Sequence, residues 1–177
     1  MARSPAIAIA SGKGGTGKTT VAVHLAATLL FRKRAVQYLD CDVEEPNGDL
    51  SPKPKIESSE SVGIPVPAID AARCIACGKC AEVCEFNVIA MLKKPLVFPE
   101  LCHGCGACAL VCPVGAIRES PRAIGVAETG RAGSIAFAQG RLNAGEPLAP
   151  PLIRAVKARR EPDAVARRPE RRLRDGH

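Results

Sequence analysis

Eight of the nine cysteines stand in two copies of one spacing. The first copy reads C-x-x-C-x-x-C-x-x-x-C from Cys74 to Cys84, and the second runs from Cys102 to Cys112, so each cysteine recurs 28 residues later. Three thiolates this close in sequence can surround one cuboidal iron–sulfur cluster, and the fourth cysteine of such a run ligates the other cluster. The spacing therefore predicts two [4Fe–4S] clusters in a protein that carries electrons or clusters.

Disulfide bonds and zinc are the alternatives for these cysteines. Disulfides are typical of exported chains, but residues 1–10 contain one Arg and an Ala/Ile run that is too short for an export signal. Structural zinc takes four ligands, commonly two C-x-x-C pairs with a longer spacer. Here a third cysteine follows each C-x-x-C at the same step. The pattern thus favours a cube over a single tetrahedral ion.

From about Ile69 to Ser120 the chain resembles bacterial two-cluster ferredoxins. Pro113 follows Cys112 as in that family, whereas Glu85 follows Cys84 where a proline is usual. The small residues Gly78 and Gly106 are expected to let the backbone pass close to a cluster. The resemblance implies one ligand set of Cys74, Cys77, Cys80 and Cys112, and a second of Cys102, Cys105, Cys108 and Cys84.

A phosphate-binding motif lies near the N-terminus. Gly12, Gly17, Lys18 and Thr19 satisfy G-x-x-x-x-G-K-[ST]. The apolar run Ala6–Ala10 before the motif predicts a buried strand, and the segment Lys18–Phe31 after it predicts a helix. Glycines let backbone N–H groups converge on phosphate oxygens, and a helix N-terminus adds partial positive charge. The motif therefore predicts an ATP site in which Lys18 faces the β- and γ-phosphates and the Thr19 hydroxyl binds Mg²⁺.

Lys13 makes this loop similar to the deviant Walker A loop of the MinD/ParA superfamily of P-loop ATPases (SIMIBI class). Residues 35–39 look like the second strand of that family and end in Asp40-Cys41-Asp42. The resemblance implies an ATP-dependent homodimer in which Lys13 reaches the partner's nucleotide. It assigns catalytic roles to Lys13, Lys18 and Asp42, with Asp42 orienting the attacking water and Asp40 near the Mg²⁺. The nucleotide-binding residues expected are Gly12, Lys13, Gly14, Gly15, Thr16, Gly17, Lys18, Thr19, Thr20 and Asp40.

The cysteine-rich segment interrupts the ATPase pattern, which returns in the strand-like runs 124–127 and 135–138. The expected fold is α/β: a partial P-loop NTPase parallel sheet interrupted by an α+β ferredoxin-like two-cluster module. We expect an N-terminal ATPase part over 1–65, the ferredoxin module over 66–120, a return to the ATPase over 121–156, and a disordered basic tail over 157–177. This order resembles MinD-superfamily ATPases with an inserted ferredoxin domain.

Composition narrows the class of partner. The formal net charge is +7, and +4 of it falls in residues 157–177. That tail has no aromatic residues to stack bases and no apolar face for lipid, so neither nucleic acid nor a membrane surface is expected. No run approaches the ~20 apolar residues of a membrane span. Free thiolates beside a P-loop favour the cytoplasm.

The favoured hypothesis is an ATP-binding iron–sulfur protein that couples ATP binding or hydrolysis to electron transfer toward a redox partner. One alternative is an ATP-dependent carrier or scaffold that delivers clusters to an apo-acceptor. Another is a plain ferredoxin-type electron carrier with a non-functional ATPase remnant. The resemblance implies ATPase activity, but the D-x-x-P-P-G-like switch loop of the family does not occur in the chain. The sequence therefore leaves hydrolysis open, and we expect that the family pattern is lost near residue 157 by truncation or by a frameshift.

Overall fold

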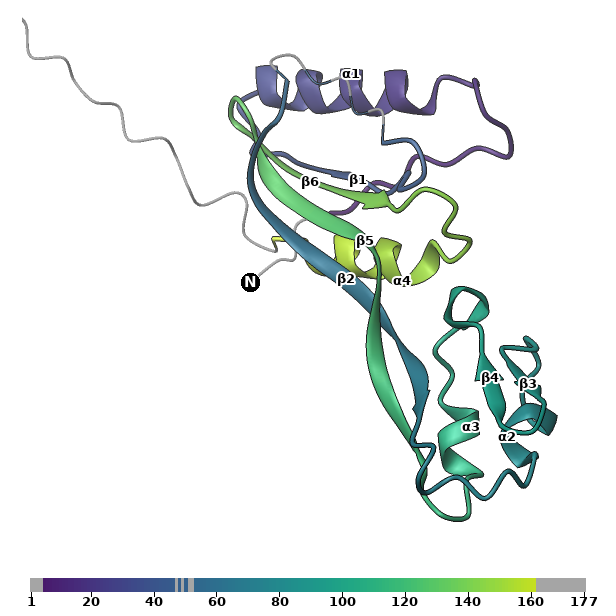
Figure 1. Cartoon of the computed structure of the whole chain (residues 1–177). Helices are drawn as coiled ribbons and strands as arrows, with labels where there is room; N and C mark the ends of the chain where they lie inside the picture. The colour runs from purple at the N-terminus through teal and green to yellow at the C-terminus, as the bar shows by residue number, and fades with distance from the viewer. Residues whose placement is uncertain (1–4, 47, 49, 51–52, 162–177) are drawn as a thin grey trace, which may run out of the picture. The chain divides into compact units, whose positions relative to one another are not determined.

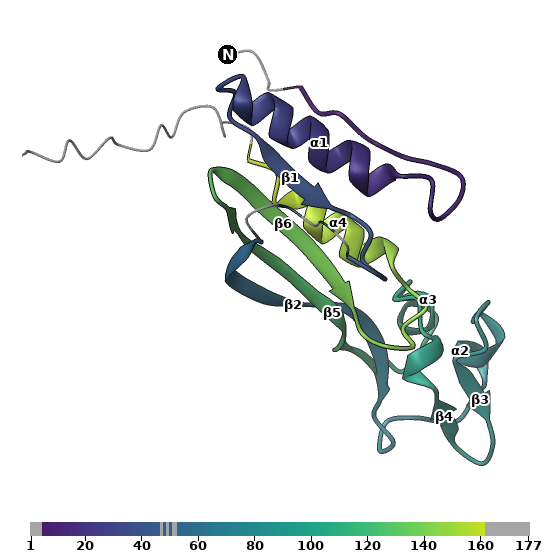
Figure 2. The same ribbon diagram turned by 90° about the horizontal axis from the view of Figure 1, so that it is seen from above.

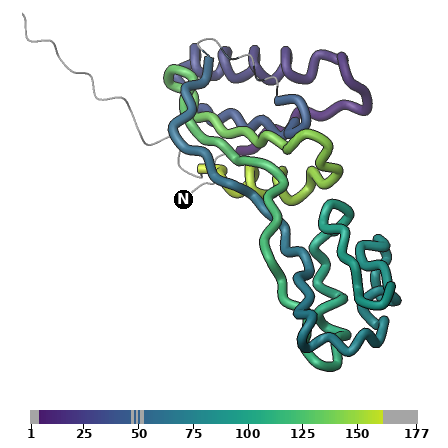
Figure 3. The backbone as a smooth tube through the Cα atoms, viewed as in Figure 1, coloured from purple at the N-terminus to yellow at the C-terminus, as the bar shows by residue number. Residues whose placement is uncertain are grey.

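The computed structural model describes residues 5–46, 48, 50 and 53–161, and the chain forms two compact units (Figure 1). The first unit contains Met1–Glu60, Ala127–Arg141 and Ile153–His177. The second contains Ser61–Val126 and Leu142–Leu152. The chain passes between the units four times (Figure 3). Among the described residues, no helix has the length and hydropathy needed to cross a membrane.

A four-stranded sheet of order β1-β6-β5-β2 is the main β structure. Its strands are β1 (Gln37–Asp40), β2 (Lys55–Ile69), β5 (Ile117–Ala132) and β6 (Ile135–Leu142). Strand β1 pairs in parallel with β6, which places Tyr38 opposite Phe137. Helix α1 (Lys18–Phe31) and helix α4 (Pro150–Ala158) lie on opposite faces of this sheet (Figure 2). The fold is α/β with a parallel strand pair, as predicted.

Apolar residues of α1 and β6 build the core of the first unit. Ala26 of α1 is buried with Ile135 and Phe137 of β6. The rings of Tyr38 and Phe137 stack with centroids 6.0 Å apart. Burial, with a smaller contribution from Asp40, raises the pKa of Tyr38 to about 12. The predicted helix over Lys18–Phe31 is confirmed, and this packing explains its position against the sheet.

The expected strand over Ala6–Ala10 is wrong. These residues have no strand conformation, and the Ile7 side chain is 64% exposed. Three of the five residues are alanines, which have low strand propensity and little apolar area to bury. Alternation of small apolar residues alone does not make a strand, because the backbone N–H and C=O groups also need a paired neighbour.

Helix α4 is fixed to the first unit by polar contacts just past its end. The Arg159 guanidinium pairs with Glu60 at 2.6 Å. The Gln37 side-chain amide donates to the Arg159 carbonyl at 2.9 Å, and the Glu161 N–H donates to the Gln37 amide oxygen at 2.8 Å. Of the expected basic tail, residues 157–158 belong to α4, and residues 162–177 lie outside the described residues.

The second unit combines parts of the long strands β2 and β5 with several short elements. Helices α2 (Lys79–Glu82) and α3 (Ala107–Leu110) are 28 residues apart, as the cysteine repeat predicts. Strands β3 (Ile89–Met91) and β4 (Pro95–Val97) form an antiparallel pair, and a 3₁₀ turn (Pro99–Leu101) follows. Arg122 of β5 makes a two-pronged ion pair with Glu146, whose side chain is 4% exposed. The hydrogen bonds from Arg122 hold the pKa of Glu146 below its ordinary value.

Replacing Gly130 with Ala should strongly destabilise the first unit. A Cβ at Gly130 of β5 would lie 2.0 Å from the Lys55 carbonyl oxygen, which belongs to the backbone and cannot rotate away. Overpacking of this kind costs about 1–3 kcal/mol or more. Urea unfolding should show the loss, whereas Gly14→Ala, where a Cβ meets nothing within 4 Å, should leave stability unchanged. Equal stability of the two variants would contradict this close strand approach.

Candidate cluster and nucleotide sites

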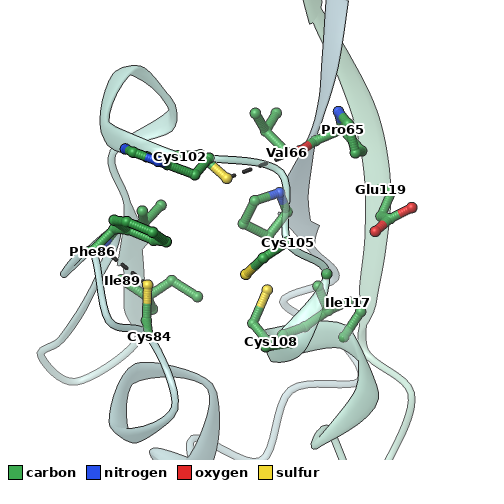
Figure 4. Close-up of a pocket in the computed structure, with 16 residues that line it drawn as sticks. Pro65, Val66, Cys84, Phe86, Ile89, Cys102, Cys105, Cys108, Ile117 and Glu119 are labelled. Atoms are coloured by element: carbon green, nitrogen blue, oxygen red, sulfur yellow. Dashed lines mark hydrogen bonds between the residues drawn. The ribbon is translucent and has the colours of Figure 1, made fainter. Parts of the chain in front are cut away.

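The eight motif cysteines line two separate pockets of the second unit. The first pocket is lined by Cys84 together with Cys102, Cys105 and Cys108, and Figure 4 shows their sulfur atoms facing one common space. The second pocket is lined by Cys112 together with Cys74, Cys77 and Cys80. We name them the Cys102 pocket and the Cys74 pocket. Each pocket takes three cysteines from one motif copy and the fourth from the other.

Local backbone geometry explains how three cysteines of one copy reach the same space. Gly78 and Gly106 immediately precede α2 and α3 and have φ of +81° and +75°, a left-handed conformation that favours glycine. The chain turns sharply there, so the cysteines on either side of the glycine face the same pocket. The structure therefore gives a conformational reason for glycine at these two positions, and the close approach of the backbone to a cluster stays a prediction.

Backbone N–H groups point at several of the sulfur atoms. The N–H of Ala116 donates to Cys112 Sγ at 3.2 Å, and the N–H of Val88 donates to Cys84 Sγ at 3.4 Å. The hydrogen bond from Ala116 lowers the pKa of the Cys112 thiol. Burial raises the pKa of the Cys80 and Cys108 thiols. A positively charged iron centre would offset that burial effect, because it favours the thiolate form.

The donor set of each pocket fits an iron–sulfur cluster. Four thiols line each pocket, with His103 and Glu119 as further donors at the Cys102 pocket, and thiol ligands suit soft metals and iron–sulfur centres better than hard cations. Among the described residues, no three Cys, His, Asp or Glu side chains are grouped as ligands of one metal ion. Thiolates of a cube bind separate corner irons, so they surround the cluster and do not need to meet at one ion.

An aromatic pair borders the Cys102 pocket. The rings of Phe86 and His103 stack with centroids 3.7 Å apart and planes 9° from parallel. Phe86 follows Cys84 by two residues, and His103 follows Cys102 directly. The stack therefore ties the loop of the fourth cysteine to the loop of the first three. The 28-residue repeat places Val114 and Ile75 at the corresponding positions of the Cys74 pocket, where both residues line the wall.

The P-loop forms a closed, exposed turn ahead of α1. The Ser11 hydroxyl donates to the Lys13 carbonyl at 2.8 Å, and the Thr16 hydroxyl donates to Ser11 Oγ at 2.7 Å. Gly17 has φ of +83° and precedes Lys18, the first residue of the helix. No side chain caps the N-terminus of α1. The first N–H groups of a 14-residue helix are thus directed at the loop, as an anion site requires.

The structure places the remaining nucleotide-site candidates as follows. Gly12, Gly14, Gly15, Thr19 and Thr20 belong to the same loop and first helical turn as Lys13 and Lys18. Within the described part of the chain, neither lysine forms an ion pair. Helix α1 and strand β1 follow each other with a short connection, so the start of α1 and the end of β1 lie at the same end of the sheet (Figure 2).

Asp40 and Asp42 have different environments at that end of β1. The Asp40 side chain is buried, and its Oδ1 accepts the backbone N–H of Asp42 at 3.0 Å. The Cβ position of Gly48 is 3.1 Å from Asp40 Oδ2, so a side chain at 48 would make a tight contact with the carboxylate. Asp42 is exposed. The half-buried Cys41 between them has a thiol pKa raised by burial.

Comparison with known protein families shows which family the chain belongs to. The family described as the CobQ/CobB/MinD/ParA nucleotide binding domain matches residues 7–148. The chain belongs to this family. The predicted resemblance to MinD/ParA proteins is thereby confirmed, and the P-loop of the first unit is that of a nucleotide-binding domain.

Several curated proteins share parts of this MinD/ParA-type chain. An uncharacterised protein of Methanocaldococcus jannaschii is 40% identical over 88 residues, which are 49% of this chain and 31% of that protein. An uncharacterised ATP-binding protein of the same organism is 53% identical over 45 residues, 25% of this chain and 17% of that protein. An iron–sulfur cluster carrier protein of Synechocystis is 56% identical over 41 residues, 23% of this chain and 12% of that protein. The matched segments thus span less than a third of these relatives.

Several pocket-lining residues other than the cysteines are not predicted by the cysteine spacing. Lys79 and Met91 line the Cys74 pocket, and Phe86 and Glu119 line the Cys102 pocket. A comparison of positions 28 residues apart would have drawn attention to them, because Lys79 corresponds to Ala107 and Met91 corresponds to Glu119. Only the structure shows that these positions face the pockets.

Proposed function

We propose that this protein binds two [4Fe–4S] clusters and MgATP, and that the nucleotide state controls electron transfer through the clusters to a partner protein. The observation that carries the proposal is the sorting of the eight cysteines into two four-thiol pockets within a member of a nucleotide-binding family. When bound, the clusters supply one-electron storage. Four thiolates per site, drawn from two chain segments, suit a resident cofactor.

The ligand assignment follows the pockets. Cys74, Cys77, Cys80 and Cys112 hold one cluster, and Cys102, Cys105, Cys108 and Cys84 hold the other. N–H groups of Ala116, Val88 and Gly104 stabilise negative charge on three of the sulfurs. Cys80 and Cys108 are partly buried, which raises the pKa of each thiol in the protein without a cluster.

The nucleotide site is assembled by the P-loop and the first turn of α1. Backbone N–H groups between Gly12 and Thr20 bind the phosphates, and Lys18 neutralises the β- and γ-phosphate charge. Thr19 holds Mg²⁺, with Asp40 beside it, and Asp42 orients the attacking water. Lys13 binds the partner's nucleotide, so ATP closes a homodimer. These roles carry over from the resemblance to the deviant Walker A family.

A second candidate function is delivery of iron–sulfur clusters to an apo-acceptor, with ATP as the release signal. The observation that favours it is the name of the matched Synechocystis relative, an iron–sulfur cluster carrier protein. Carriers must release the cluster readily. The two functions therefore differ in one measurable property, which is retention of the cluster.

The test uses protein reconstituted anaerobically. We expect about eight irons per chain, absorption near 400 nm that bleaches on reduction, and full recovery on reoxidation. Reduction by dithionite should change in rate or extent with MgATP, and apo-ferredoxin mixed with the protein should gain no cluster over about an hour. Transfer to apo-ferredoxin within minutes, stimulated by ATP, would establish the carrier function instead. Four zinc ions, or no metal, would contradict both.

A further inference from the structure

The two cysteine pockets are related by the 28-residue repeat, so residues 28 apart occupy equivalent positions, and the charges at these positions differ. The position directly after the αL glycine is Lys79 at the Cys74 pocket and Ala107 at the Cys102 pocket. Another equivalent pair is Met91 at the Cys74 pocket and Glu119 at the Cys102 pocket. The Cys74 pocket therefore has a cation where the Cys102 pocket has an alanine, and the Cys102 pocket has a carboxylate where the Cys74 pocket has a methionine.

Glu119 lies against the loop that carries three of the cysteines. Its Oε1 is 2.9 Å from the point that a Cβ of Gly106 would occupy, and Gly106 stands between Cys105 and Ala107. At the other pocket, Glu82 Oε1 is 3.8 Å from the corresponding point at Gly78, and Glu82 does not line the pocket. The carboxylate contact is therefore closer at the Cys102 pocket.

A second cationic side chain, that of Arg73, lies beside the Cys74 pocket and has no equivalent at the Cys102 pocket. Arg73 Nη2 donates to the carbonyl of Val114 at 2.8 Å, and Val114 lines that pocket. The equivalent position at the Cys102 pocket is the uncharged Leu101. Arg122 also lies near Cys102, but its charge is balanced by the ion pair with Glu146.

We propose that these charges give the two sites different reduction potentials, with the Cys74 site reduced first. The proposal rests on the proposed function, because it needs both sites to hold a cluster. An external low-potential one-electron donor loses one electron, and the site that accepts it gains one negative charge. Lys79 and Arg73 stabilise that added charge at the Cys74 site, and Glu119 opposes it at the Cys102 site. A single electron therefore resides at the Cys74 site, and only a second electron reduces the Cys102 site.

The test measures each site separately. Cys77→Ala removes the Cys74 site and Cys105→Ala removes the Cys102 site, so each variant reports one cluster by anaerobic redox titration followed by electron paramagnetic resonance. At one applied potential, the ratio of reduced to oxidised cluster should be up to about tenfold higher at the Cys74 site, the size expected when the charges of several exposed residues differ between the two sites. In the Cys77→Ala background, which keeps only the Cys102 site, Glu119→Gln should raise the ratio of reduced to oxidised cluster several-fold. In the Cys105→Ala background, which keeps only the Cys74 site, Glu119→Gln should have no effect. Lys79→Gln should lower the ratio only at the Cys74 site.

Each outcome decides one point. Equal ratios at the two sites, a more easily reduced Cys102 site, or equal shifts at both sites from Glu119→Gln would overturn the inference while leaving the proposed function intact. If the single-site variants do not load iron, the wild-type titration serves, because Glu119→Gln should move only the more negative of its two waves. Higher salt should shrink the Glu119→Gln shift if the effect is electrostatic. Wild-type protein that binds no iron would refute the proposed function and the inference together.

Discussion

Replacement of Cys112 by Ala should remove the cluster of Cys74, Cys77 and Cys80, not that of the motif in which Cys112 itself stands. Cys112 lines the Cys74 pocket, and its Sγ accepts the Ala116 N–H at the rim of that pocket. Loss of one of four thiolates leaves an iron without its protein ligand. Iron content should fall from about eight to about four per chain, and Cys84→Ala should give the same loss for the other site.

Double replacements reveal which cluster each cysteine holds, because iron counts of single variants are alike. Cys77→Ala with Cys112→Ala removes two ligands of one site, so about four irons should remain. Cys105→Ala with Cys112→Ala removes one ligand from each site, so almost no iron should remain. The opposite pair of results would mean that each motif copy holds its own cluster, and the crossed assignment would be wrong.

The cysteine pockets show what a sequence repeat predicts well. Tight spacing fixes which thiols are neighbours, because Gly78 and Gly106 reverse the chain within a few residues. The partner of each distant fourth cysteine came only from resemblance to ferredoxins, and the pockets of the structure contain those same sets. Helix α1 was equally predictable, because the helical spacing of its apolar residues can be read within one continuous segment.

The predictions that were wrong or missing concern contacts between residues that are separated in the sequence. The run Ala6–Ala10 has the apolar character of a strand, but strand formation needs a pairing partner that no local pattern identifies. The approach of Glu119 to Gly106 joins residues of β5 and a cysteine loop. Asp40 is buried with its carboxylate close to Gly48, and the Asp40-Cys41-Asp42 pattern alone does not indicate which carboxylate is exposed.

Lys18→Ala should strongly weaken nucleotide binding. Lys18 is the first residue of α1, where it follows the left-handed Gly17 and stands beside the uncapped N–H groups of the helix. Its ammonium group is the cation expected opposite the β- and γ-phosphates, and hydrogen bonds to charged groups are worth about 1.5–3 kcal/mol, or roughly 10- to 100-fold in affinity. Titration with a fluorescent ATP analogue measures the loss. Lys33→Ala removes the same charge just past the other end of α1 and should bind normally.

Lys13→Ala should separate binding from dimerisation. The carbonyl of Lys13 is held inside the loop by Ser11 and Thr16, whereas its side chain forms no ion pair among the described residues. Removing the side chain therefore leaves the loop contacts in place and takes away only the charge that we propose reaches the nucleotide of a partner subunit. The variant should bind the analogue as tightly as wild type and fail to dimerise with MgATP in sedimentation velocity. Equal loss of binding in Lys13→Ala and Lys18→Ala would instead show that both lysines contact the same nucleotide, and the deviant-loop role of Lys13 would then be wrong.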